Sequence, residues 1–239
     1  MRYTNAMQGL LLVNKPAGWT SFDVVNYVRR IVAQVEDKKP KNCKVGHTGT
    51  LDPFATGLLV LLIGKEYTRR AGELSKLDKT YEVTMKLGET SSTGDPEGET
   101  TIVSDTIPTP EALQAAVEHF RGPISQVPPA FSAIKINGQR AYKLAREGKE
   151  VIIEPRHVTI NSLEVTNYVY PKVELITNVS SGTYIRTLVE DIGKVLGSGA
   201  YTTTLRRTRV GSYHLDQALS VPSLNPETLQ AGLHSLKTP

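Results

Sequence analysis

A glycine-rich loop that leads directly into a long apolar run is the feature that most constrains how this chain can fold. The loop, VGHTGTLDPFATG, covers residues 45–57, and the run LLVLLI, residues 58–63, follows without a break. Consecutive apolar residues of this length predict a buried strand. Glycine, aspartate and proline in the preceding stretch are typical of a turn. We therefore expect a buried strand that begins at a polar, tightly turning loop.

The rest of the chain mixes strands and helices without a regular alternation. Residues 79–88, KTYEVTMKLG, alternate apolar and polar side chains, which predicts a strand with one face in solvent. Further strands are expected at residues 8–14, 151–154, 156–168, 172–181 and 206–215. Helices are expected from Ser21, over residues 110–120 and 138–148, and from near Thr183. This order predicts an α+β fold with a mixed, largely antiparallel central sheet flanked by helices.

Two of the expected helices carry an apolar stripe. Along the first helix the stripe consists of Phe22, Val25, Val28, Val32 and Val35. Along the helix that starts near Thr183 it consists of Ile185, Leu188, Val189, Ile192, Val195 and Leu196. Each stripe predicts the face that packs on the sheet. No interior stretch has the composition of a linker, so we expect a single domain over residues 1–239.

Composition and missing motifs narrow the chemistry. The chain has a net charge of +4 and a pI near 9.0, which favours an anionic partner. Its one cysteine, Cys43, fits a reducing, cytoplasmic setting, and no run is long enough for a membrane span. The five histidines lack metal-ligand spacing, and nucleotide-binding glycine motifs are absent. We expect no metal and no cofactor, and a reaction carried out by side chains alone.

Asp52 and Arg186 are the first candidates for that reaction. Asp52 precedes Pro53, which restricts its backbone to extended conformations, and a partly buried carboxylate needs a positive partner. Arg186 lies in the first turn of its helix, where the helix dipole disfavours a cation. It either forms a surface ion pair with Glu190 at i+4, or an anion lies there, Asp52 or a phosphate.

Tyr81 begins the alternating strand at residues 79–88. It is either an ordinary half-buried strand residue or a ring that faces a groove and stacks on an RNA base. The glycines of the loop, Gly46, Gly49 and Gly57, allow another backbone, of the protein or of a ligand, to approach closely.

Several motifs together resemble the TruB family of tRNA pseudouridine synthases. KVGHTGTLDPFATGLLVLLIGKEYTR resembles the family's catalytic motif, and LLLVNKPAGWTSFDVV its Lys-Pro motif. DKTYEVTMKLGETSSTGD resembles the tyrosine motif, and VPPAFSAIKINGQRAYKLAREG the central segment. VSSGTYIRTLVEDIG and LRRTRVGSYHLDQAL resemble the arginine motif and the closing strand. In this order the motifs cover nearly the whole chain, and we expect no C-terminal RNA-binding domain of the PUA type.

The resemblance implies a role for each matched residue. Asp52 matches the catalytic aspartate, Arg186 the arginine that pairs with it, and Tyr81 the tyrosine that stacks on the target base. The resemblance also implies substrate-binding residues: His47, which enters the T-loop, Lys15, Gly49, Tyr184 and Leu205. For three of these a plain alternative stays open, namely an ordinary loop histidine at His47, a strand-end turn at Lys15 and simple core packing at Leu205.

The resemblance implies the pseudouridine synthase fold with a catalytic cleft, and isomerisation of uridine to pseudouridine at position 55 in the T-loop of tRNA. The T-loop and stem of tRNA are then the partner, with no obligate protein partner, and a monomer is expected. Two alternatives stay open: an RNA-binding or tRNA-folding module without turnover, and a synthase with broader RNA targets.

Overall fold

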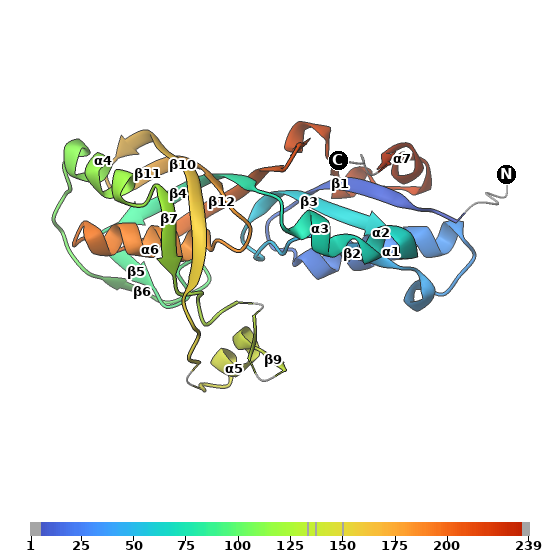
Figure 1. Ribbon diagram of the computed structural model, residues 1–239, viewed down its shortest axis with the longest axis horizontal. Helices are drawn as coiled ribbons and strands as arrows, with labels where there is room; N and C mark the ends of the chain where they lie inside the picture. The colour runs from blue at the N-terminus through green and yellow to red at the C-terminus, as the bar shows by residue number, and fades with distance from the viewer. Residues whose placement is uncertain (1–5, 133, 137, 150, 236–239) are drawn as a thin grey trace. The chain divides into compact units, whose positions relative to one another are not determined.

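The computed structural model describes residues 6–132, 134–136, 138–149 and 151–235, which form two compact units (Figure 1). The first unit consists of the chain up to Lys79 and from Arg206 onward, and the second of Thr80–Leu205. The chain enters the second unit inside strand β4 (Lys79–Leu87) and leaves it inside strand β12 (Ala200–Val210). Because both crossings lie inside strands, no linker marks the boundary in the sequence.

The sheet of the first unit is built around two long strands. Strand β1 (Gly9–Lys15) pairs antiparallel with β3 (Thr56–Ile63) from end to end. Strand β12 adds to β3 in parallel, and β14 (Leu219–Ser220) adds to β1 in parallel. Short strands complete this sheet: β2 (Val45–His47) on β3, β13 (Tyr213–His214) on β12 and β15 (Leu233–His234) on β1.

Both faces of β1 and β3 are buried, as the apolar run predicts. Leu11, Leu59 and Leu61 face a core that includes α1 (Ser21–Val35) and α7 (Pro226–Ala231). Leu10 and Leu58 face the opposite core, against α2 (Lys65–Arg69) and α3 (Ala71–Ser75). The 3-10 helices of this unit are η1 (Pro40–Asn42), η2 (Leu215–Gln217) and η3 (Val221–Ser223). The prediction of a buried strand at residues 58–63 is confirmed.

Helix α1 begins at Ser21, as expected, because Thr20 and Asp23 form a capping box at its start. Its buried face includes Val25, Val28 and Val32 of the predicted stripe, and it also extends to Val24 and Ile31. Phe22 is 58% exposed, so its assignment to the packed face was wrong. Its ring lies under the Arg29 guanidinium, 5.7 Å from the ring centroid.

The sheet of the second unit has the strand order β12-β4-β11-β10-β7. Strand β10 (Arg156–Val169) pairs antiparallel with both β11 (Lys172–Val179) and β7 (Gly122–Gln126). Two further small sheets pair β5 (Glu89–Ser91) with β6 (Thr100–Ile102), and β8 (Lys135–Ile136) with β9 (Gln139–Arg140). Figure 1 shows the part that holds β9 and α5 (Ala141–Arg146) as an excursion from the sheet of this unit.

Two longer helices pack in the second unit. Helix α4 (Pro110–His119) contacts β10 and α6 (Ile185–Val195). The alternation of β4 is confirmed, since its residues are buried at every second position from Lys79 to Leu87. Two expectations were wrong: residues 151–154 form no strand, because no ladder partner is paired with them, and Val195 of the α6 stripe is 54% exposed.

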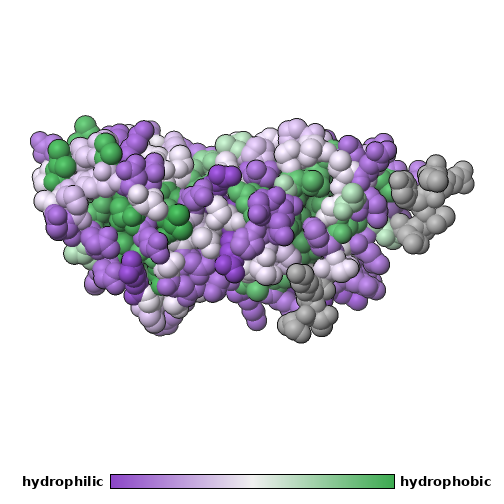
Figure 2. Space-filling model, turned by 90° about the horizontal axis from the view of Figure 1, so that it is seen from above, coloured by the Kyte–Doolittle hydropathy of each residue, from purple (hydrophilic) through white to green (hydrophobic). Residues whose placement is uncertain are grey.

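Antiparallel and parallel pairings together confirm an α+β fold with a mixed sheet. The face drawn in Figure 2 is largely hydrophilic, with apolar residues in separate patches. Within the described ranges, no helix has both the length and the apolar character needed to cross a membrane.

Candidate active site

Asp52 lies, half-buried, in the loop between β2 and β3. Its carbonyl accepts the Ala55 N–H at 3.1 Å, which closes a turn over residues 52–55. The Pro53 carbonyl accepts the Gly18 N–H at 2.8 Å and ties the loop to the segment after β1. The stretch is therefore a turn, and this turn holds the acid in a defined place.

Two polar side chains from outside the loop hold its backbone on either side of Asp52. The Ser21 hydroxyl accepts the Leu51 N–H at 2.8 Å and donates to the Leu51 carbonyl at 3.1 Å. Lys15 is fully buried, and its ammonium donates to the carbonyls of Pro16, Trp19 and Pro53 at 2.9, 2.6 and 3.2 Å. Lys15 therefore joins the end of β1 to the loop that follows β2.

The loop glycines differ in what they permit. Gly57 has φ +100°, and a Cβ there would lie 2.3 Å from the Arg207 carbonyl oxygen, so close approach of another backbone is confirmed at this position. A Cβ at Gly49 would meet only side-chain atoms at ordinary contact distance, 3.5 Å, and one at Gly46 would meet Thr68 at 3.8 Å. Among the described residues, no protein backbone makes such an approach to Gly46 or Gly49, and approach of a ligand there stays a prediction.

His47 ends strand β2, opposite Leu61 of β3, and is half-buried. The next residue is also bound to β3, since the Thr48 N–H donates to the Val60 carbonyl at 3.1 Å. His47 is thus anchored at the edge of the sheet, at the beginning of the loop that leads to Asp52.

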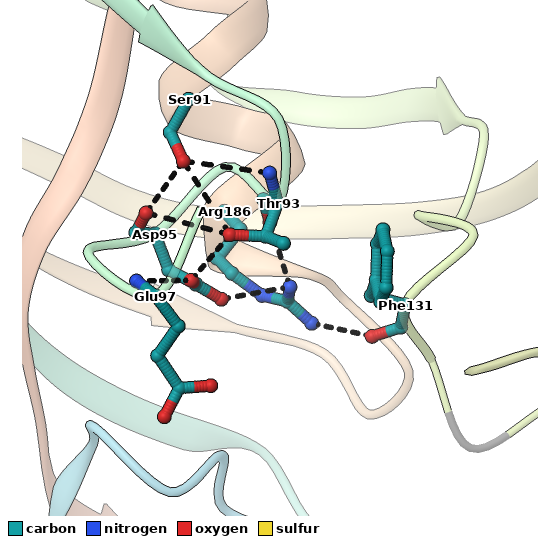
Figure 3. Close-up of polar contacts among 6 residues, drawn as sticks. All are labelled: Ser91, Thr93, Asp95, Glu97, Phe131 and Arg186. Atoms are coloured by element: carbon teal, nitrogen blue, oxygen red, sulfur yellow. Dashed lines mark hydrogen bonds and ion pairs between the residues drawn. The ribbon is translucent and has the colours of Figure 1, made fainter. Parts of the chain in front are cut away.

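Arg186 of α6 is buried, with only 4% of its surface exposed, and it is held on three sides (Figure 3). Its Nη1 donates to the Thr93 carbonyl at 2.8 Å and to Asp95 Oδ2 at 3.0 Å. Its Nη2 donates to the Phe131 carbonyl at 2.8 Å. A guanidinium suits this environment because its planar fork can satisfy several acceptors at once.

Asp95, the carboxylate in this pair, is itself 3% exposed. Its Oδ1 accepts the Thr93 hydroxyl at 2.6 Å and the Glu97 N–H at 3.0 Å. The Ser91 hydroxyl donates to the Asp95 backbone carbonyl at 2.6 Å (Figure 3). Both oxygens of the carboxylate are therefore satisfied, which is the condition for a stable buried charge.

A surface ion pair of Arg186 with Glu190 is thereby contradicted, because Arg186 is not on the surface. Glu190 lies one turn further along α6, and burial raises the pKa of its carboxyl, while Lys194 and Arg186 oppose that rise. Gly94 has φ +72°, and a Cβ there would lie 2.7 Å from Glu190 Oε1. The loop that carries Asp95 thus lies against the first turns of α6.

Of the other predicted residues of the second unit, Tyr81 and Leu205 pack in its interior, and Tyr184 is half-buried. Tyr81 of β4 and Leu205 of β12 are each 7% exposed. Tyr184 precedes α6, and Gln126 holds its backbone: the Tyr184 N–H donates to Gln126 Oε1 at 2.8 Å, and Gln126 Nε2 donates to the Tyr184 carbonyl at 3.0 Å. The start of α6, and with it Arg186, is fixed by this amide.

The predicted site residues fall into two groups. Lys15, His47, Gly49 and Asp52 belong to the first unit, where Lys15 contacts the residue that follows Asp52. Tyr81, Tyr184, Arg186 and Leu205 belong to the second unit. A meeting of Asp52 with Arg186 stays a prediction.

Sequence reasoning missed Asp95 as a partner of Arg186. A signal was present, because Asp95 precedes Pro96 just as Asp52 precedes Pro53. The same restriction of the backbone applies at both positions. Nothing local in the sequence indicates that the carboxylate of this second Asp-Pro pair is buried.

Comparison with known proteins assigns the family. Residues 36–185 match the family model described as TruB family pseudouridylate synthase (N terminal domain). Residues 186–232 match the one described as tRNA pseudouridylate synthase B C-terminal domain. The chain therefore belongs to the TruB family of tRNA pseudouridine synthases, enzymes that isomerise uridine to pseudouridine.

Individual relatives agree with this assignment. The tRNA pseudouridine synthase B of Pseudomonas putida is 43% identical over 235 residues, which are 98% of this chain and 74% of the relative. That of Mycobacterium sp. (strain KMS) is 47% identical over 227 residues, 92% of this chain and 72% of the relative. A crystal structure of a Cbf5-Nop10-Gar1 complex matches with a TM-score of 0.67 and 29% identity; the match covers 90% of this chain but about half, 53%, of that one. The family expected from the motifs is confirmed.

Proposed function

We propose that this chain converts uridine to pseudouridine at position 55 in the T-loop of tRNA, and that both units act as one catalytic domain. Its curated relatives are named tRNA pseudouridine synthase B, which supports tRNA as the substrate. The T-loop position rests on the resemblance of the ordered motifs. The observation that carries the catalytic assignment is the loop around Asp52, whose backbone is tied to the protein at Leu51 and at Pro53.

In this proposal Asp52 is the nucleophile and attacks the flipped uridine or its ribose. The bond between N1 of uracil and C1′ of ribose breaks, the base rotates in the site, and a bond between C5 and C1′ forms, while the bond that Asp52 made in its attack breaks again and restores the free carboxylate. The C5 hydrogen leaves as a proton and N1 gains a proton, so no oxidant, reductant or group donor is consumed. A carboxylate must be ionised to attack, and a held loop keeps it aimed without further ordering.

Arg186 is proposed to keep the nucleophile ionised, because a nearby guanidinium favours the charged form of a carboxylate. This requires that Asp52 of the first unit approach Arg186 of the second. Arg186 is suited to the role because Asp95 and two carbonyls already fix its orientation. A second carboxylate would then share a guanidinium that is held in advance.

The remaining predicted residues are proposed to bind the RNA. Tyr81 stacks on the target base, Leu205 packs near it, and Tyr184 lines the same place. His47 enters the T-loop and helps to displace the target. Unstacking a base costs a few kcal/mol, which such contacts repay. Lys15 and Gly49 are proposed to support the site through the loop that carries Asp52.

A cytoplasmic location, a monomeric state and independence of any cofactor or obligate protein partner stay predictions. Gel filtration of the purified chain tests the monomer. Activity of that same preparation in buffer with a metal chelator and no added partner tests the rest of these predictions except the location.

Incubation of the purified chain with unmodified tRNA, followed by mapping of pseudouridine, tests the function directly. We expect modification at position 55 of the T-loop. Asp52→Asn should abolish it while tRNA binding persists, because the amide keeps the shape of the side chain but cannot act as the nucleophile. If Asp52→Asn modifies the tRNA at the normal rate, the catalytic assignment is wrong.

The same assay separates the alternatives. A tRNA-folding module would bind tRNA in a salt-dependent way and leave the uridine unchanged. A synthase with broader targets would modify other transcripts at comparable rates, so a panel of structured RNAs belongs in the experiment.

A further inference from the structure

Arg207 of β12 is 2% exposed and is among the largest buried side chains of the described residues. Its Nε donates to the Leu58 carbonyl at 2.8 Å, its Nη2 to the Gly49 carbonyl at 3.0 Å, and its Nη1 to the Thr50 carbonyl at 3.4 Å. Every acceptor is a backbone carbonyl. Among the residues that the structure describes, no carboxylate forms an ion pair with it.

Burying a guanidinium without a carboxylate partner is energetically unfavourable compared with burying an apolar side chain. Desolvating a cation is costly, and an apolar side chain of similar length would pack at no such cost. Burial also requires that several donors be satisfied, and here two of the three hydrogen bonds go to Gly49 and Thr50. These hydrogen bonds fix the orientation of the Gly49 and Thr50 peptide groups.

These two carbonyls begin a run in which the backbone is held at every residue. From Gly49 to Pro53 each carbonyl accepts a hydrogen bond. The donors, in order, are Arg207, Arg207 again, Ser21, the Ala55 N–H, and for Pro53 both Lys15 and the Gly18 N–H. The residues 49–55 form no helix or strand, so side chains and local turns must supply these donors.

The path of β12 explains how Arg207 reaches the loop. Arg207 is opposite Gly57 in the parallel pairing of β12 with β3. Because Gly57 has no side chain, the Arg207 backbone approaches to a distance at which any Cβ would clash, 2.3 Å from the Arg207 carbonyl oxygen. The guanidinium then extends over Leu58 to the carbonyls on the other side of the loop. Gly57 and Arg207 therefore work as a pair.

We propose that Arg207 is a positioning residue, which fixes the Gly49 and Thr50 peptide groups and thereby the direction in which the loop presents Asp52. This inference rests on the proposed role of Asp52 as nucleophile. Thr50 and Asp52 are two residues apart, so their Cα atoms lie within about 7 Å. A change in the orientation of the Thr50 peptide group therefore also changes the position of the Asp52 carboxylate.

Arg207→Met tests the proposal, because methionine is long and apolar but has no donor. The readouts are the midpoint of thermal unfolding, the Kd for tRNA, and the single-turnover rate of pseudouridine formation with tRNA at saturation. We expect the rate to fall about 100-fold, the loss typical of a misplacement near 1 Å, and the Kd to change less than about threefold. All measurements are made below the unfolding midpoint of the variant.

Arg121→Met is the control for loss of a guanidinium that holds a carbonyl outside the loop, and the Arg121 side chain differs from that of Arg207 in being 38% exposed and paired with Glu118. The Arg121 guanidinium also holds a backbone carbonyl, that of Leu163, at 3.0 and 2.8 Å, but it belongs to the second unit. We expect its single-turnover rate to stay within about twofold of the unaltered chain, because it is distant in sequence from every proposed site residue. A rate loss in Arg121→Met equal to that in Arg207→Met would overturn the specific role of Arg207.

Chemical rescue gives a readout that a purely structural role would not move. Arg207→Ala leaves space for a small guanidinium, so millimolar methylguanidinium should restore part of the single-turnover rate. The same concentration of urea should not. If Arg207→Met or Arg207→Ala fails to fold, the rate of Arg207→Lys tests the positioning role instead. Lysine carries its charge on a single nitrogen, so we expect this variant to fold and to react at an intermediate rate.

Besides an equal rate loss in Arg121→Met, three outcomes overturn the proposal: a normal rate in folded Arg207→Met, no methylguanidinium rescue of folded Arg207→Ala, and a normal rate in Arg207→Lys. Asp52→Asn, measured alongside, separates this failure from failure of the proposed function. An active Asp52→Asn refutes the nucleophile. An inactive Asp52→Asn together with a fully active Arg207→Met refutes only the positioning role.

Discussion

Arg186 and Asp95 form an ion pair of 3.0 Å between residues 91 positions apart in the chain, and each is almost completely buried. The pair joins the first turn of α6 to the loop between β5 and β6. Because both charges are out of solvent, each depends on the other and on the surrounding hydrogen bonds. This relationship explains how a cation can occupy the beginning of a helix, where the helix dipole disfavours it.

Asp95→Asn should destabilise the protein strongly. The amide keeps the size of the side chain but removes the negative charge that pairs with the buried Arg186 guanidinium at 3.0 Å. Loss of one partner of a buried pair costs about 3–5 kcal/mol in the free energy of unfolding. Urea denaturation followed by circular dichroism measures this loss.

Glu118→Gln is the control, since it breaks the pair of Arg121 with Glu118, whose side chains are 38% and 59% exposed. That change should cost less than about 1 kcal/mol. Equal losses in Asp95→Asn and Glu118→Gln would show that burial of the first pair is unimportant.

Gly57→Ala should be among the most damaging small substitutions in the first unit. The positive φ disfavours any L side chain, and the added Cβ would clash with the Arg207 backbone. Backbone strain and overpacking together predict a loss of roughly 3 kcal/mol or more. Gly72→Ala in α3, where a Cβ meets nothing within 4 Å, should instead be neutral or stabilise by about 0.5–1 kcal/mol. Thermal unfolding of the two variants checks the contrast in sign.

Lys79 should make stability rise with pH. Burial, reinforced by Arg207 and opposed by Asp78, lowers the pKa of Lys79 from 10.5 to about 8. Between these two values the unfolded state binds more protons than the folded state, so the free energy of unfolding increases with pH across this window. Below pH 8 both states are protonated, and the contribution of Lys79 is constant.

The comparison with Lys79→Met isolates this effect. The substitution also removes the hydrogen bonds of Lys79 to the Ser75 and Leu77 carbonyls, which adds an offset that does not depend on pH. The difference between the unaltered chain and Lys79→Met should be flat below pH 8 and should then grow in favour of the unaltered chain up to about pH 10.5. Chemical denaturation over a pH series measures it, with Lys194→Met as the surface control, since the Lys194 side chain is 71% exposed. A difference that stays flat throughout contradicts the prediction.

Gln126→Glu should loosen the start of α6. A carboxylate can still accept the Tyr184 N–H, but it cannot donate to the Tyr184 carbonyl as the amide does. The Tyr184 carbonyl keeps the Leu188 N–H at 3.1 Å, but Gln126 is 2% exposed, so the carboxylate oxygen that replaces the amide nitrogen loses a hydrogen bond away from solvent, at a cost of about 1–3 kcal/mol. Acidification should reduce the loss, because a protonated carboxyl regains a donor. Unfolding measured at neutral and acidic pH checks both statements, and a loss that grows on acidification relative to the unaltered chain would refute the second.

Local sequence patterns were sufficient for most of the secondary structure. The alternation in β4 acts within a few residues, so it was visible without the fold. The capping residue Thr20 before α1 and the first-position proline of α4 are equally local features of the sequence. Residues 151–154 misled, because an apolar run forms a strand only where a neighbouring strand is available. The assignment of Phe22 to the packed face failed for a related reason. Periodicity shows which residues share one face of a helix, but it does not show how far along the helix the packed surface extends.

The candidate site shows the same division. The Asp-Pro sequence at Asp52 and the ordered motifs were enough to assign the family and to propose the nucleophile. Only the tertiary structure showed that Arg186 is buried and pairs with Asp95. Only the tertiary structure showed, likewise, that Arg207 donates hydrogen bonds to the loop that carries Asp52. The physical reason is that a buried charge is defined by the atoms that surround it, and these come from segments far apart in the chain, whereas turns, caps and alternation depend on neighbours in sequence.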